Sequence, residues 1–235
     1  ADGVNKNDST IKVYIDSWYE SNIKDKYDNK LEDTVFCNDR STTSLGGWNP
    51  NGGDTTQYLR FKNYDTNNQS LVCANETDRF SHGNTKAYLK YSIGLLSEPE
   101  LRLAGYGSNH YFNNGQHVWL ASPNHLDFGV AYVRLASSGV FSDGGAVYGS
   151  SGVRPSVSLK PNTEFTDGDG SFTNPFVIGD TVEEPSGNSF DTVFAANNTD
   201  IFNENGLRYE GADPNNYICL DNKTSGACSS SSLLF

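Results

Sequence analysis

Positive charge is scarce in this sequence of 235 residues. Lys and Arg together number 17, against 29 Asp and Glu, which gives a formal net charge of −12 at pH 7. Because a nucleic-acid binder neutralises phosphates with a basic surface, we expect no nucleic-acid partner. Long apolar runs are missing as well, and the sequence therefore predicts no membrane insertion. Methionine is absent even at position 1, so we expect a processed or excised product.

Hydrophobic residues are also few, at 35%. The 13 Tyr, 13 Phe and 3 Trp offset this shortage, because each aromatic side chain buries a large apolar area. The chain can therefore form a packed core and is not disordered as a whole. Asn, with 26 residues, and Gly, with 23, are abundant, and both favour turns over helices. We expect a loop-rich fold that is not all-helical.

The cysteines number four, and none of them forms a C-x-x-C motif. The four His lie far from them in the sequence, so a zinc site is not expected. The number is even and the two pairs lie in different regions, which favours two disulfides, Cys37–Cys73 and Cys219–Cys228, and an oxidising compartment. The alternative is four buried free thiols in a cytosolic protein.

Two short helices are expected in the first half of the chain. Residues 13–27 carry apolar side chains at roughly helical spacing. A second helix begins after Ser97, which can cap it. Pro99 suits its first turn, and Gly105 can end it.

Strands are expected in most of the remaining chain. The pattern of apolar residues predicts them near 58–61 and at 87–93, 117–121, 129–136, 140–148 and 152–160, and a last strand follows the turn within 166–178. Turn residues predict breaks at 123–124, 137–139 and 142–145. On the 152–160 strand one face is expected to carry Val153, Pro155, Val157 and Leu159.

The composition changes along the chain. Residues 107–151 hold seven Gly, seven aromatic residues and three of the four His, with only Asp127, Arg134 and Asp143 as charged residues. Residues 180–200 are acidic and rich in small residues, which is typical of a linker.

Four separated blocks together resemble a known family. They are LEDTVFCNDRS (31–41), IGLLSEPELRLAG (93–105), VWLASPNHLDFGVAYVRLASSGVF (118–141) and GVRPSVSLKPNTEFTDGDGSFTNPFVI (152–178). In this order they resemble surface-type proteins of gut Gram-positive bacteria and their phages, some of which are similar to variable proteins of diversity-generating retroelements. The resemblance covers about residues 1–178. It implies an α+β, C-type-lectin-like fold, close to the variant found in formylglycine-generating enzymes, with two short helices and a strand-rich, loop-rich second half.

The resemblance also bears on the domain organisation. It implies a C-type-lectin-like ligand-binding domain at 1–179, followed by the acidic linker at 180–200. Residues 201–235 resemble the segment that precedes this domain in the family. Either the chain is circularly permuted and 201–235 packs on the domain, with Leu233–Phe235 in a strand, or the chain is cut at the start of a second unit. We favour the permuted or folded-back arrangement.

The family's variable region corresponds to about residues 107–151. Adenine-directed mutagenesis of Asn-like codons does not produce Lys, Glu, Gln, Met or Trp. This range contains no Lys, Glu or Met, and its one Gln (Gln116) and one Trp (Trp119) lie in the constant G-Q-x-x-W stretch. The resemblance therefore implies a diversified binding face, although any neutral, β-rich loop face has a similar composition. The candidate ligand-binding residues are His110, Tyr111, Asn113, His117, Asn124, His125, Asp127, Phe128, Arg134, Phe141, Asp143 and Tyr148. For Tyr111, Phe141 and Tyr148 the alternative is a place in the core.

Other notable residues are expected to be structural. Trp119 and Tyr132 are assigned to the core, and Arg154 to a link with a carboxylate or carbonyls. The spacing of the three clustered His fits no compact metal motif. The DGDGS run at 167–171 resembles a calcium loop, but Ile178 occupies the twelfth position, where such a loop needs Glu, so we expect a hairpin turn. The Glu-Pro-Asn and Trp-Asn-Asp motifs of calcium-dependent lectins are absent.

Catalytic motifs are also missing. The G-x-S-x-G nucleophile motif does not occur, and no Cys between 73 and 219 could carry formylglycine-type chemistry. We therefore predict an extracellular ligand-binding protein of the adhesin or receptor type, at a bacterial cell surface or on a phage particle. It would have no enzymatic activity and no cofactor, and it would bind a protein or glycan ligand. The alternatives are a non-catalytic structural module of a surface protein and a calcium-dependent glycan-binding lectin.

Overall fold

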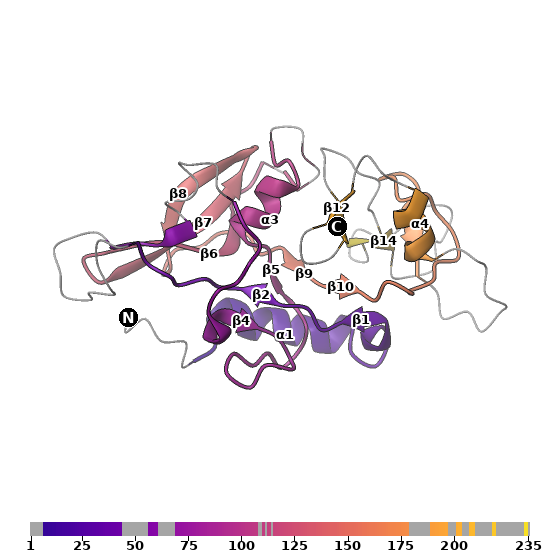
Figure 1. Ribbon diagram of the computed structural model, residues 1–235, viewed down its shortest axis with the longest axis horizontal. Coiled ribbons are helices and arrows are strands. Elements are labelled where there is room, and N and C mark those ends of the chain that lie inside the picture. Colours follow the sequence, from indigo (N-terminus) through magenta and orange to yellow (C-terminus); the bar gives the residue numbers. More distant parts are fainter. Residues whose placement is uncertain are drawn as a thin grey trace.

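The protein combines helices and strands, as expected for the α+β class. Figure 1 shows α1 (Thr10–Asn22) along one side, the long strands β6 (Val118–Asp127), β7 (Val130–Ser137) and β8 (Val140–Ala146) at one end, and α4 (Phe190–Ala196) at the other. This computed structural model describes residues 7–43, 56–60, 69–107, 110, 112–113, 115–178, 189–196, 201–203, 207–209, 218–219 and 233–234.

The first expected helix is present as α1, but it begins and ends earlier than the range 13–27. Ser9 caps it, because its hydroxyl accepts a hydrogen bond from the backbone N–H of Lys12 at 3.1 Å. Asp25 has a φ of 62°, which no α-helix accommodates, so the chain leaves the helix before this residue. A 3-10 helix, η1 (Asp28–Lys30), follows.

Three short antiparallel ladders involve the first half of the chain. Two of them join it to the second half, and one joins two segments of the first half. β1 (Leu31–Glu32) pairs with β10 (Ser158–Leu159), β2 (Phe36–Cys37) with β4 (Arg79–Phe80), and β5 (Gly94–Leu95) with β9 (Pro155–Ser156). Between β2 and β4 lies a second 3-10 helix, η2 (Glu76–Asp78). The expected strand at 152–160 is thus divided between β9 and β10.

The largest hydrophobic cluster lies around α1. Its buried members include Ile15, Tyr19, Ile23, Leu31 and Ile93. Three of the four residues predicted on one face of 152–160 pack against it, namely Val153, Val157 and Leu159.

The strand expected at 87–93 is wrong. This segment contributes a single bridge, from Tyr88 to Ser81. The alternation in its sequence reflects the burial of Ala87, Leu89 and Ile93 within an irregular segment. The strand expected near 58–61 lies slightly earlier, as β3 (Thr56–Gln57).

The second half of the chain contains a four-stranded sheet with the order β3–β6–β7–β8. The strands expected at 117–121, 129–136 and 140–148 are confirmed as β6, β7 and β8, and the turn at 137–139 is confirmed around Ser138 and Gly139. The turns expected at 123–124 and 142–145 are wrong. Both segments lie inside strands, where the register shifts and the chain passes the irregularity without reversing.

The second expected helix is confirmed as α3 (Glu98–Leu103). Ser97 and Glu100 form a capping box, in which each side chain bonds the other's backbone N–H. Gly105 follows at a φ of 80°, the left-handed conformation that commonly ends a helix. Leu101 of this helix packs with Val118, Leu120 and Ala136 in a second hydrophobic cluster.

The C-terminal part adds a three-stranded sheet, in which β14 (Ile218–Cys219) pairs in parallel with β11 (Phe176–Val177) and antiparallel with β15 (Leu233–Leu234). β12 (Ile201–Asn203) and β13 (Leu207–Tyr209) form a separate ladder. The segment 180–200, expected to be a linker, contains α4, whose Phe190 is buried against Phe165 and Phe176. The composition of this segment therefore did not predict the helix, because the residues around the buried Phe190 are small or acidic. The circular permutation of 201–235 stays a prediction.

The expected disulfide between Cys37 and Cys73 is present, with an S–S distance of 2.04 Å. The pairing of Cys219 with Cys228 lies outside the described side chains. Disulfides persist in oxidising compartments, so the Cys37–Cys73 bond is consistent with an extracellular location. Within the described ranges, no helix combines the length and apolar character that a membrane crossing requires.

Candidate ligand-binding groove

Two adjoining hollows lie beside the start of α1, the first against β2, β4 and β5 and the second against the four-stranded sheet. The first has a volume of about 820 Å³ and the second of about 730 Å³. Both volumes are in the range of small-molecule and peptide sites. The hollows share Ser9, Ile11, Asn38, Arg40, Leu95 and Ala121 as lining residues, so we treat them as one groove.

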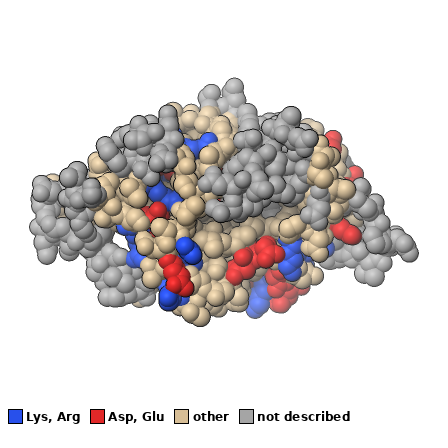
Figure 2. Space-filling view, in the orientation of Figure 1, with Lys and Arg blue, Asp and Glu red and all other residues tan. Residues whose placement is uncertain are grey.

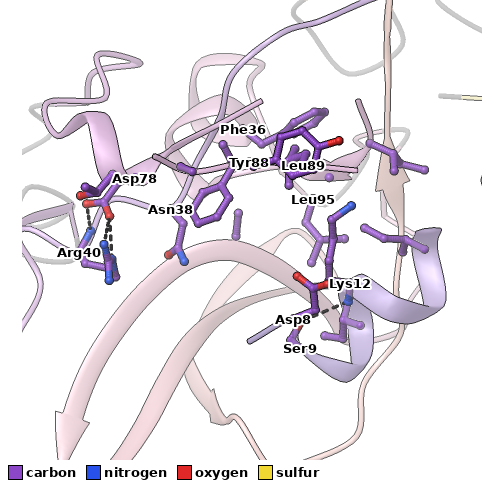
Figure 3. Close-up of a pocket in the computed structure, with 18 of the residues that line it drawn as sticks. Asp8, Ser9, Lys12, Phe36, Asn38, Arg40, Asp78, Tyr88, Leu89 and Leu95 are labelled. Carbon is purple, nitrogen blue, oxygen red and sulfur yellow. Dashed lines mark hydrogen bonds and ion pairs between the residues drawn. The ribbon is translucent and has the colours of Figure 1, made fainter. Parts of the chain in front are cut away.

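The first hollow opens onto the main hydrophobic cluster. Ile15 and Ile93, both members of that cluster, line it together with Phe36 and Leu89. Figure 3 shows Asp8, Ser9 and Lys12 on one side of this hollow and Arg40 with Asp78 on the other, with the apolar side chains between them. The first hollow therefore has an apolar floor and polar sides.

Arg40 is held in place by Asp78 on η2. Its Nε lies 2.6 Å from Asp78 Oδ1, and its backbone N–H donates to Oδ2 at 3.0 Å. The neighbouring Asp39 pairs with Arg60 at 2.9 Å between Oδ2 and Nε. Burial opposes ionisation of Asp39, but hydrogen bonds from Ser41 and Arg60 outweigh it and lower the pKa of this carboxyl. The segment after Cys37, which forms this side of the groove, is thus held in place by ion pairs, and its charges are matched within the protein.

The second hollow lies against one face of the sheet. Trp119, Ala121 and Pro123 of β6 line it with Val133 of β7, and we call this the groove face. The other side of the sheet, which we call the α3 face, is contacted by the intervening residues. Leu120 packs there in the second cluster, while it also borders the second hollow, and Ser122 accepts a hydrogen bond from the Glu98 backbone at 2.8 Å.

Tyrosines stand at three places in the second hollow. Tyr148 is 80% exposed at its edge, in the turn that follows β8. Tyr132 is half-buried and stacks on His125, with the ring centroids 4.3 Å apart. Tyr58 is buried, and burial raises the pKa of its hydroxyl to about 12.

The structure corrects three of the candidate contact residues. Arg134 is 1% exposed and forms a buried ion pair with Glu98, at 2.6 Å between Nε and Oε2. Asn124 is fully buried inside β6. His110 is buried against Tyr106, and its Nδ1 accepts a hydrogen bond from the backbone N–H of Phe112 at 3.2 Å. Their polar types suggest a surface role, but these side chains are directed into the interior.

The remaining candidates differ in exposure and location. His117, Phe128 and Tyr148 are exposed, whereas Asn113, His125, Asp127 and Phe141 are half-buried. Phe141 packs against Tyr106 and the second cluster, in line with the core alternative. Tyr111 and the side chain of Asp143 lie outside the described residues. Of the described candidates, Tyr148 lines the groove.

The residues predicted to have structural roles also differ in burial. Trp119 is buried, as predicted, whereas Tyr132 is half-buried and borders the second hollow. Arg154 donates from Nη1 to the carbonyl of Phe112 and lies over its ring, 4.6 Å from the centroid, as expected for a structural arginine.

Most of the groove residues were not predicted from the sequence. Ser9, Asn38, Arg40 and Leu95 come from parts of the first half that carry no recognisable binding motif. The one local signal is the polar run Asn38–Arg40 directly after Cys37, since a disulfide can fix such a run in place.

Metal-binding potential is low in the part of the chain that the structure describes, where no group of three or more His, Cys, Asp and Glu side chains could hold an ion. The DGDGS segment folds as the expected turn. Gly168 and Gly170 have positive φ values, and the backbone N–H of Val177 donates to the carbonyl of Asp167 at 2.8 Å.

A scan against protein-family models, a search of the curated proteins and a search of the solved structures each found no match to this chain. The C-type-lectin-like fold and the family resemblance therefore stay predictions.

Proposed function

We propose that the protein is an extracellular ligand-binding module of the adhesin or receptor type, and that the groove is its binding site. The observation that carries the proposal is the groove itself: two hollows with apolar floors, polar sides and exposed tyrosines at the edge. Ligand sites in proteins combine an apolar lining with a few oriented polar groups in this way.

The proposal places the module in a C-type-lectin-like fold outside the cell. The mixed helix and strand architecture and the disulfide support this placement. The mechanism is complementarity without catalysis. Rigid tyrosines supply contact area at a low entropy cost, as aromatic residues do in other recognition surfaces.

Burial narrows the set of positions at which diversification is expected. A receptor that varies at 107–151 keeps its buried residues constant, because changes at Arg134 or Asn124 disrupt the sheet. We expect sequences of this locus from several isolates to vary at exposed positions such as His117, Phe128 and Tyr148. Uniform variation along the chain would count against diversification.

Binding can be tested with arrays of immobilised peptides and neutral oligosaccharides, probed with the whole chain. In the groove-blocking variant Ala121→Arg a long charged side chain stands at a position that lines both hollows. Val140→Arg is the matched control, since it adds the same charge to an exposed position of the same sheet outside the groove.

We expect the wild type and Val140→Arg to retain the same probes and Ala121→Arg to lose them. Thermal unfolding of both variants checks that the fold is intact. If no probe is retained by the wild type and lost in Ala121→Arg, the proposed function is overturned.

A further inference from the structure

The groove is apolar at its floor, and its basic side chains are paired with carboxylates of the same protein; these two properties together restrict its ligand. We propose that the ligand is an extended, uncharged peptide segment with aliphatic side chains at alternating positions, lying along both hollows. This inference rests on the proposed function of the groove and names the chemistry of its occupant.

The floor of the first hollow argues for aliphatic side chains. Ile15 and Ile93 belong to the main core cluster, and Leu95 lies on the wall between the hollows. An occupant that reaches them gains free energy by removing apolar surface from water. A sugar hydroxyl placed there would lose its hydration without a hydrogen-bond partner, which is unfavourable.

The charges of the groove argue for an uncharged ligand. Lysine and arginine side chains on its sides are paired with carboxylates of the same protein: Lys12 with Asp16, Arg40 with Asp78, and Lys86 with Glu76. Figure 2 shows the same arrangement on the visible face, where acidic and basic groups lie next to one another. A charged ligand would have to compete with these pairs, whereas a neutral one leaves them intact. Asp8, the other charged side chain that lines the first hollow, is exposed, so it keeps its contact with water beside a neutral ligand.

The shape of the groove argues for an extended chain. Two hollows share one wall, so one occupant can fill both only if it is long and narrow. Exposed tyrosines line each hollow, Tyr88 the first and Tyr148 the second. In an extended peptide successive side chains point to opposite sides, so alternate residues enter the hollows while the others face solvent.

The test uses a fluorescent, uncharged peptide of about ten residues that alternates Val or Leu with Ser. Two control probes are the same peptide with Asp in place of Val and Leu, and a neutral oligosaccharide of similar length. Binding to the whole chain is measured by fluorescence anisotropy. We expect the Val/Leu peptide to bind and both control probes to bind at least about tenfold more weakly.

Variants locate the site. Tyr148→Ala removes an exposed side chain whose loss does not endanger folding, and we expect it to weaken binding of the Val/Leu peptide about tenfold. Tyr14→Ala is the matched control, since Tyr14 is 62% exposed on α1 and lines neither hollow. A photoreactive residue at the centre of the peptide is expected to crosslink to the shared wall, near Ser9, Leu95 or Ala121.

The outcomes separate the two proposals. Failure of the Val/Leu peptide to bind, or equal weakening by Tyr148→Ala and Tyr14→Ala, would overturn the peptide inference. Oligosaccharide binding that is lost in Ala121→Arg, without peptide binding, would overturn it too, while the proposed function would stand.

Discussion

The two faces of the four-stranded sheet are built on different principles. On the α3 face, polar side chains are buried and matched, as Arg134 is with Glu98 and Ser122 is with the α3 backbone. On the groove face, Trp119 and Ala121 border a hollow of about 730 Å³, and Arg40, which is paired with Asp78, stands at its side.

This difference indicates that stability and binding depend on different faces of the sheet. The α3 face contributes a closed interface in which every change leaves a cavity or an unmatched group. The groove face leaves apolar surface available to an external partner. Substitutions on the first face should therefore act on folding, and substitutions on the second on binding.

The largest expected effect belongs to the buried ion pair of the α3 face. Arg134→Met removes one of the two arginines that bond the buried carboxylate of Glu98, while Arg102 remains on it. We expect the free energy of unfolding to fall by about 3–4 kcal/mol, the lower part of the range for breaking a buried ion pair. Equilibrium denaturation in urea measures this loss. Combining Arg134→Met with Glu98→Leu should recover part of it, because no buried carboxylate then remains, while the partly buried Arg102 loses its ion-pair partner. A loss below about 1 kcal/mol in the single variant would show that the α3 face does not depend on this pair.

The disulfide on the groove side is expected to have the next largest effect. Replacing both Cys37 and Cys73 by Ser opens a loop with a sequence separation of 36, and we expect a loss of about 2–4 kcal/mol. Because Cys37 directly precedes the groove residue Asn38, peptide binding should weaken as well. Arg134→Met, by contrast, should not change the affinity of the protein that remains folded. Equal effects of both variants on affinity would contradict the separation of the two faces.

The buried histidine of the α3 side predicts a pH dependence. Burial lowers the pKa of His110, against a weaker opposing effect of its hydrogen bond with the Ala104 carbonyl. As pH falls below the ordinary value near 6.5, the unfolded chain binds a proton that the folded one does not. Stability should therefore decrease toward acidic pH, by at most about 1.4 kcal/mol per pH unit from this group.

His110→Asn tests this dependence. An Asn side chain can also accept a hydrogen bond from the backbone N–H two residues later, as the His110 ring does from Phe112. We expect a shallower decrease of stability between neutral and mildly acidic pH in this variant, measured by urea denaturation at several pH values. An unchanged slope would assign the pH dependence to other groups.

The smallest effect is expected at the tip of the β6–β7 hairpin. Phe128 is 76% exposed at a φ of 42°, and Gly129 follows at 78°, so two residues with positive φ make the turn. Phe128→Asn should raise stability by about 1 kcal/mol, because Asn tolerates this conformation better and little buried area is lost. Thermal unfolding measures the gain, and Phe128→Val is the opposite control because a β-branched residue is strained there.

Local signals explain what could be predicted from the sequence. The capping box at Ser97 and the hairpin strands depend on residues that lie near one another in the sequence. The Cys37–Cys73 pairing could be predicted because the number of cysteines is even and the two pairs lie in different regions. The burial of consecutive residues Pro123 and Asn124 in β6 could not be predicted, because the register shifts twice between Trp119 and His125 and simple alternation fails after Pro123. Asn124 and Arg134 therefore look like surface residues in the sequence although they are buried.

The groove could not be predicted for a different reason. Its lining comes from the start of α1, from the segment after Cys37, from β5 and β6, and from the turn after β8. These segments meet only after the fold has formed, and none of them carries a motif on its own. Residues 107–151 contribute one wall of the groove, while the other wall comes from the first half of the chain.

The guanidinium of Arg60 reaches both sides of the disulfide crosslink. It donates to Asp39 at 2.9 Å and to Cys37 Sγ at 3.3 Å on one side, and to the carbonyls of Ser70 and Val72 on the other. This arginine is therefore a noncovalent clasp that runs parallel to the covalent one. When the disulfide is reduced, the clasp keeps the two thiols at a high effective concentration, so we expect the correct pair to re-form within the same molecule before either thiol reacts with a neighbour.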